Sequence, residues 1–145
     1  MEIQERTAKS LAHRDKMAEL EAAMIEFGTP AELEEKHYFA HGTYTRELFI
    51  PKGTTLTGKI HRHSCINIIS QGKIRVITDE GEYDIEAPHT MVSGEGVKKA
   101  GYALEDTVWI NVHPWDGVSD LNQLEQQVIA PSYESLDYEE KLCLG

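Results

Sequence analysis

The spacing of hydrophobic residues divides this chain into three parts. Residues 3 to 27 contain no glycine or proline, and mostly apolar side chains recur among them at helical spacing. This stripe predicts an N-terminal helix with one packing face. From Tyr38 the period becomes two, as in β-strands. Helical spacing returns over Asp120–Ile129, which predicts a C-terminal helix. The stripe consists of His13, Met17, Leu20, Met24 and Phe27. The predicted parts are a helical extension (1–37), a β domain (38–114) and a C-terminal helix with an acidic tail (115–145).

Short strands separated by turn residues fill the middle part. Between the strands lie turn signals such as Gln71-Gly72 and Gly94-Glu95-Gly96. Many short strands at spacings of roughly 8–12 residues indicate an antiparallel sandwich or barrel. The predicted strands are Tyr44–Ile50, Thr54–His63, Ile66–Ile69, Lys73–Thr78, Glu82–Ile85, Thr90–Ser93, Lys99–Ala103 and Thr107–His113.

Charge and composition narrow the classes of function. The chain has 25 acidic and 14 basic residues, and a net charge of −11 disfavours binding to DNA or RNA polymers. A small anion could still bind in a local basic pocket. No apolar run is long enough to cross a membrane or to act as a secretion signal, so we expect a cytoplasmic protein that does not bind membranes. Cys65 and Cys143 are a poor disulfide framework, and we expect free thiols.

His61 and His63 are the first candidates for a site. In an extended strand, residues two apart point to the same side, so these imidazoles share a face. Such a pair can be part of a metal site, can anchor a polar ligand, or can be structural. The strand Thr107–His113 similarly puts Trp109, Asn111 and His113 on one face. If that face is internal, His113 is a candidate third imidazole; the alternative is that the face is solvated and the valines form the core.

The glycines around these histidines carry a family resemblance. Gly58, His61, His63 and Gly72 match the first motif of the cupins, and Gly94 and Gly96 match glycines around the second. The chain therefore resembles a cupin, which implies an all-β cupin (jelly-roll) barrel, here with an N-terminal helix and a C-terminal helical extension. Cupins often pair, so a homodimer or higher homo-oligomer is expected. The runs 50–63 and 105–114 look more narrowly like small cupin-like proteins encoded by tailed bacteriophages.

The sequence departs from the cupin pattern at two of the four usual metal ligands. Asn67 or Ile68 stands at the glutamate position, and Lys99 stands where the second motif has histidine. An ammonium group at a ligand position competes with a metal ion and favours an anion. With Lys98 nearby, this predicts a cationic pocket in which Tyr102 or Trp109 stacks on a ring. The alternative is that both lysines are exposed turn residues.

Three hypotheses of function follow. The first is a non-catalytic binder of a small anionic ligand, phosphate- or nucleotide-like, without a cofactor; the phage resemblance adds sequestration of a host defence signal. The second is a cupin enzyme, an oxygenase or isomerase, with one divalent transition metal held by His61, His63 and His113. The third is a structural or host-interaction protein with a vestigial pocket. The candidate ligand-binding residues are His61, His63, Asn67, Lys98, Lys99, Tyr102, Trp109, Asn111 and His113.

Overall fold

A computed structural model gives the arrangement of most of the chain. It describes residues 12–23, 33–58, 60–78, 81–94, 99–117 and 129–130, with only the backbone at 60, 61, 129 and 130. Residues 12–23 form the predicted helix, and two residues of its stripe, His13 and Met17, are buried. Met24 and Phe27 lie outside the described residues. Within the described part of the chain, no helix is long and apolar enough to cross a membrane.

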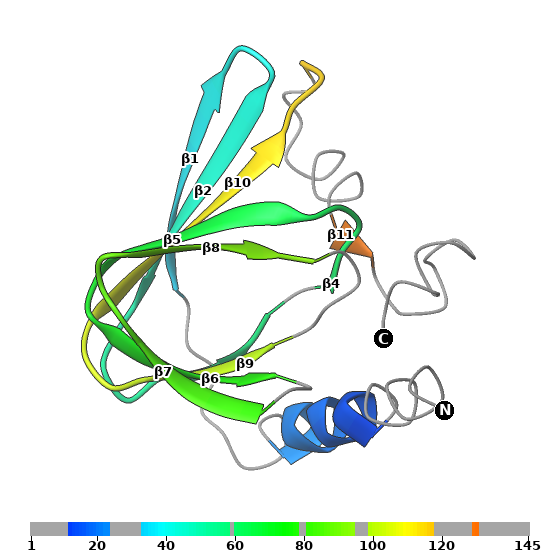
Figure 1. Cartoon of the computed structure of the whole chain (residues 1–145), viewed down its shortest axis with the longest axis vertical. Helices are drawn as coiled ribbons and strands as arrows, with labels where there is room; N and C mark the ends of the chain where they lie inside the picture. The colour runs from blue at the N-terminus through cyan, green and yellow to red at the C-terminus, as the bar shows by residue number, and fades with distance from the viewer. Residues whose placement is uncertain are drawn as a thin grey trace.

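The strands form two main antiparallel sheets and one short pair. The larger sheet has the order β1-β2-β10-β5-β8, the smaller one has the order β3-β9-β6-β7, and β11 pairs with β4. Figure 1 shows the strands β5 and β8 of the larger sheet above β6, β7 and β9 of the smaller one. The strands are β1 (Glu34–Ala40), β2 (Thr43–Ile50), β3 (Thr55–Thr57), β4 (Ile60–His61), β5 (Cys65–Gln71), β6 (Lys73–Thr78), β7 (Gly81–Glu86), β8 (His89–Ser93), β9 (Ala100–Ala103), β10 (Thr107–Pro114) and β11 (Ile129–Ala130).

The inner faces of the two sheets form the hydrophobic core. Alternation along each strand directs every second side chain inward, and both sheets contribute to one cluster. Trp109, Leu33 and Leu56 pack against that cluster while remaining partly exposed. The buried cluster consists of Leu48, Ile50, Ile69, Ile74, Val76, Ile85 and Ala103. The core therefore lies between the sheets, as a sandwich or barrel requires.

Strand register brings three polar residues into one row on the inner face of the larger sheet. Arg46 on β2 lies opposite Asn111 on β10, and Asn111 lies opposite Asn67 on β5. Directly opposed residues of antiparallel strands point to the same face. A polar row therefore crosses the inner face of the larger sheet.

The predicted strand Thr54–His63 is wrong. The chain forms β3, leaves it at Gly58 and then enters β4, while residues 62 and 63 form a bend. Gly58 donates a backbone hydrogen bond to the Lys99 carbonyl at 2.7 Å, which ends the pairing of β3 with β9. Because β4 pairs with β11 instead, His61 and His63 do not lie together on one strand.

The C-terminal helix predicted over Asp120–Ile129 lies almost wholly outside the described residues. Its last residue, Ile129, belongs to β11 and pairs with His61 of β4. At that residue the helix prediction is wrong, since a tertiary pairing replaces the local helical preference.

Candidate functional site

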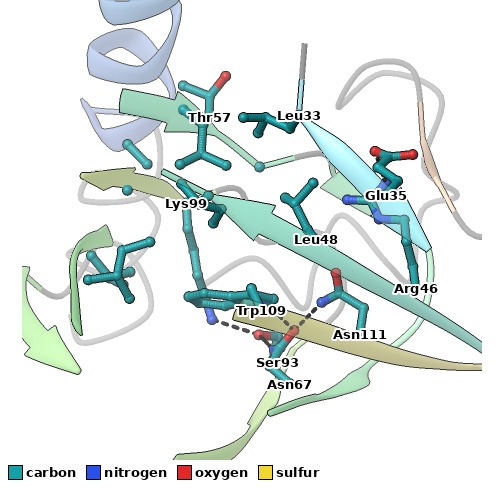
Figure 2. A pocket seen from close by; sticks show the side chains of 17 residues that line it. Leu33, Glu35, Arg46, Leu48, Thr57, Asn67, Ser93, Lys99, Trp109 and Asn111 are labelled. Atoms are coloured by element: carbon teal, nitrogen blue, oxygen red, sulfur yellow. Dashed lines mark hydrogen bonds and ion pairs between the residues drawn. The ribbon is translucent and has the colours of Figure 1, made fainter. Parts of the chain in front are cut away.

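A cavity of about 250 Å³ lies between the two sheets. Figure 2 shows its wall, in which Lys99 extends toward Ser93 and Asn67, with Arg46 and Glu35 at the other side of the view. Apolar side chains of both sheets complete the wall. The lining residues are Leu33, Glu35, Arg46, Leu48, Ile50, Leu56, Thr57, Gly58, Asn67, Ile74, Val76, Ser93, Lys99, Ala100, Gly101, Trp109 and Asn111.

Asn67 is the centre of a buried hydrogen-bond network in this wall. Its Oδ1 accepts hydrogen bonds from Nε1 of Trp109, at 3.2 Å, and from Nδ2 of Asn111. Its Nδ2 donates to Oγ of Ser93. Only 2% of Asn67 is exposed. Because an indole N–H can only donate, the contact with Trp109 fixes which end of the Asn67 amide accepts.

Lys99 is attached to this network through Ser93. Its Nζ donates to Oγ of Ser93 at 2.6 Å, so that oxygen accepts hydrogen bonds from both Lys99 and Asn67. Among the described residues, no carboxylate forms an ion pair with Lys99. Burial lowers the pKa of Lys99, and the neighbouring Cys65 partly opposes that shift. The ammonium group is thus half-buried at a cavity wall, and among the described residues it donates to a hydroxyl.

Arg46 and Glu35 add a second charged group to the wall. Nη1 of Arg46 lies 3.7 Å from Oε1 of Glu35. Nε of Arg46 is buried and has no hydrogen-bond partner in the described part of the chain. Arg46 is therefore only partly satisfied by the protein, and Glu35 offsets its charge.

Cys65 lies on the same inner face as Asn67, next to this network. It is a buried free thiol, as predicted; Cys143 lies outside the described residues. Burial raises the pKa of the Cys65 thiol, although the positive charges of Lys99 and Arg46 act in the opposite direction. Its Sγ lies 3.8 Å from Oδ1 of Asn67. This environment keeps the sulfur protonated, as in a structural cysteine.

His113 is buried but does not line the cavity. Its ring stacks on Tyr44, with the centroids 5.9 Å apart, and Tyr44 also stacks on His37 and shares a 2.6 Å hydrogen bond with it. Burial lowers the pKa of His113 to about 4, and the charges of Arg46 and His63 act in the same direction. His113 is therefore neutral at pH 7.

Protonation of His113 is expected to destabilise the protein. Its pKa is 6.5 when unfolded and about 4 when folded, a difference worth about 3 kcal/mol. This stabilisation is complete above pH 6.5 and is lost as the pH falls toward 4. Urea unfolding at pH 7 and pH 4.5 measures the loss. His113→Gln should reduce the difference between the two pH values, whereas the same change at the exposed His89 should not. Equal pH dependence in both variants would contradict the assignment.

The structure brings some of the predicted site residues together and separates others. Asn67, Lys99, Trp109 and Asn111 line one cavity, so the polar face of β10 is the internal one. Tyr102 does not line it: its side chain is 42% exposed, because it alternates with the buried Gly101 and Ala103, and its predicted stacking role is wrong. The side chains of His61 and Lys98 lie outside the described residues.

The structure also places His63 away from the cavity. His63 is exposed in the bend after β4 and does not line the cavity. Of the three imidazoles proposed as metal ligands, His113 lies farther along the inner face and His63 lies outside the cavity wall. Among the described residues, no three His, Cys, Asp or Glu side chains are gathered as a metal site would require.

The donor groups of the cavity do not suit a divalent metal ion. The described wall carries one carboxylate, from Glu35, which is paired with Arg46, and a second cation in Lys99. A divalent transition metal in proteins is usually bound by three or more carboxylate, imidazole or thiolate ligands. The Lys99 ammonium, with which no described carboxylate forms an ion pair, would repel it.

Among the residues of this wall that sequence reasoning missed are Glu35, Arg46 and Ser93. Arg46 had a signal, since it alternates with Tyr44 and Leu48 on a strand whose inner face is otherwise apolar. Glu35 and Ser93 had none, because their position depends on pairings with distant strands.

Comparison with known proteins finds solved structures that share the fold of this chain. The sequence matches no protein-family model and no curated protein. Three solved structures that resemble the chain are KdgF from Halomonas, a cupin superfamily protein from Desulfitobacterium hafniense and a putative ethanolamine utilization protein Q from Salmonella typhimurium. Their sequence identities are 16%, 9% and 10%, and their TM-scores are 0.50, 0.51 and 0.51. They cover 59%, 61% and 61% of this chain and 84%, 82% and 73% of their own.

The chain therefore has the β-barrel fold of the cupins. Its strands, two antiparallel sheets and an internal cavity agree with the resemblance seen in the sequence. At such low identities the likeness concerns the fold alone, and the function must be argued from the cavity. The narrower likeness to phage proteins stays a prediction.

Proposed function

We propose that this protein binds a small anionic ligand, without catalysis, in the cavity between its two sheets. Lys99 is the principal anion-binding group, and Arg46, which sequence reasoning missed, is the second cation. The Asn67 network holds Ser93 and Asn111 in place beside them. The ligand class predicted from the sequence included phosphate- and nucleotide-like anions, and both belong in the test.

The observation that carries this proposal is the environment of Lys99. The ammonium lines the cavity, is half-buried and donates to Ser93, and no described carboxylate pairs with it. A buried ammonium without a counter-charge is costly, and a bound anion removes that cost. The same charge argues against the metal-dependent alternative.

Replacing Lys99 with methionine should weaken anion binding by about 10- to 100-fold, because a charge-assisted hydrogen bond contributes ~1.5–3 kcal/mol. The probes are inorganic phosphate, adenosine monophosphate and hexanoate, and calorimetry measures their affinities. Native mass spectrometry of the purified protein, with elemental analysis, detects any ligand or metal that it already carries.

Lys52→Met is the matched control for Lys99→Met. Lys52 is exposed and outside the cavity wall, so the variant loses the same charge at a distance. Its affinities should equal those of the unmodified protein. If no probe binds in a way that depends on Lys99, the proposal is wrong. The hypothesis of a structural or host-interaction protein with a vestigial pocket is then favoured.

The biological role that we attach to this binding is sequestration of a host signal by a phage protein, which rests only on the sequence resemblance.

We also propose a homodimer. Ile66 and Val92 support it, since they lie opposite each other on the outer face of the larger sheet and are 45% and 72% exposed.

A further inference from the structure

The charges on the described wall of the cavity add up to one uncompensated cation. Glu35, Arg46 and Lys99 are the ionisable residues among those that line it. Glu35 lies 3.7 Å from Arg46 and offsets its charge, whereas Lys99 has only Ser93 as a partner among the described residues. A ligand with one negative charge would balance this wall, and a dianion such as a phosphate monoester would leave a charge unmatched.

The wall that carries the Lys99 ammonium also carries hydrogen-bond donors that the described residues leave unused. A serine hydroxyl has one hydrogen and two lone pairs, and both lone pairs of Ser93 already accept, so its hydrogen is left to donate. Asn111 uses one amide hydrogen on Asn67 and has a second. Lys99 has two further N–H groups. Ser93 and Asn111 line the same cavity as Lys99, and several donors on one wall match the two oxygens of a carboxylate.

Most of the remaining side chains of the wall are apolar. Leu33 and Leu48 lie on the side of the cavity away from the Ser93 and Asn67 contacts in Figure 2. Hydroxyl groups of a ribose would lose their hydrogen bonds to water against such a surface, whereas a hydrocarbon would gain by leaving water. The apolar lining residues are Leu33, Leu48, Ile50, Leu56, Ile74, Val76 and Ala100.

The cavity volume gives a scale for the apolar part of a ligand. A space of about 250 Å³ equals about eight waters at ~30 Å³ each, roughly the volume of an acid with six to eight carbons. We infer that the ligand is a monocarboxylate with a compact apolar body, its carboxylate bound by Lys99, Ser93 and Asn111 and its body on the leucine and isoleucine side chains. This inference rests on the proposed function and narrows its ligand class.

Calorimetry with a series of straight-chain acids tests the inference. Affinity should rise about fourfold for each methylene added from butanoate to hexanoate, because each additional methylene is buried against the apolar wall. Hexanamide, which has the same body without the charge, should bind at least ~10-fold more weakly than hexanoate. Lys99→Met should abolish this preference for the acid, and Lys52→Met should keep it.

A second variant tests the apolar side of the cavity. Leu56 lines the wall and is partly exposed, so Leu56→Gln alters the lining without emptying the core. It should flatten the dependence on chain length and leave the preference for acid over amide intact.

The outcomes separate this inference from the proposed function. Tighter, Lys99-dependent binding of phosphate or adenosine monophosphate than of hexanoate would overturn the inference and leave the proposed function standing. Affinity for the acids that does not change with chain length, or that survives Lys99→Met, would also overturn it. If no anion binds in a Lys99-dependent way, both fail.

Discussion

Gly72→Ala is expected to destabilise the protein by about 4 kcal/mol, the combined cost of a left-handed backbone and a steric clash. Gly72 connects β5 of the larger sheet to β6 of the smaller one and has a φ of 89°. A Cβ at this position would lie 2.2 Å from the Asp106 carbonyl oxygen and 2.8 Å from Cα of Thr107. Both are backbone atoms, so the clash cannot be relieved by turning a side chain. Urea unfolding followed by circular dichroism measures the loss.

Gly53→Ala separates the two causes. Gly53 has a φ of 85°, close to that of Gly72, but a Cβ there would meet nothing within 4 Å. This variant should therefore lose only about 1 kcal/mol, from the backbone conformation. If the two variants lose the same stability, the close approach of the chain to Gly72 is not the cause.

Asn67→Ala should be the second most damaging change, with a loss of about 3 kcal/mol. The substitution removes the acceptor of Trp109 and Asn111 and the donor to Ser93, and each buried group left without a partner costs ~1–3 kcal/mol. Because Ser93 also accepts from Lys99, the ammonium should lose its fixed position, and anion binding should weaken at the same time. Urea unfolding and calorimetry with hexanoate measure the two effects.

Asn111→Ala is the matched control, since it removes the same amide from the neighbouring strand. Among the described residues the Asn111 side chain makes one hydrogen bond, to Asn67, whereas the Asn67 side chain makes several. Asn111→Ala should therefore lose less stability than Asn67→Ala, about 1 kcal/mol. Equal losses of stability in the two variants would contradict the assignment of Asn67 as the centre of the network.

The strands β5 to β10 could be predicted to within two residues of their ends. Alternation is a local signal, and turn residues such as Gly72 and Gly94 mark where each strand stops. The failure over 54–63 has a physical cause. The alternation continues through Gly58, but the chain leaves the sheet there, because β3 and β4 pair with different partners.

Part of the candidate site could also be predicted from the sequence. Trp109 and Asn111 were named because their positions on one strand follow from local alternation, and Asn67 and Lys99 because of the family pattern. The sequence left open whether Asn67 or Ile68 points inward; in the structure Asn67 is 2% exposed and Ile68 lies on the other face.

The sequence by itself determined the period of each segment, and with it the β class, most strand positions and the residues that share a face. Tertiary structure decided which face is internal and which residues meet. Ser93 reaches Lys99 and Asn67 only because β8 pairs with β5. Arg46 joins Asn67 in one row because β10 pairs with both β2 and β5. Those pairings link residues far apart in the chain, and a pattern that repeats every two residues carries no information about them.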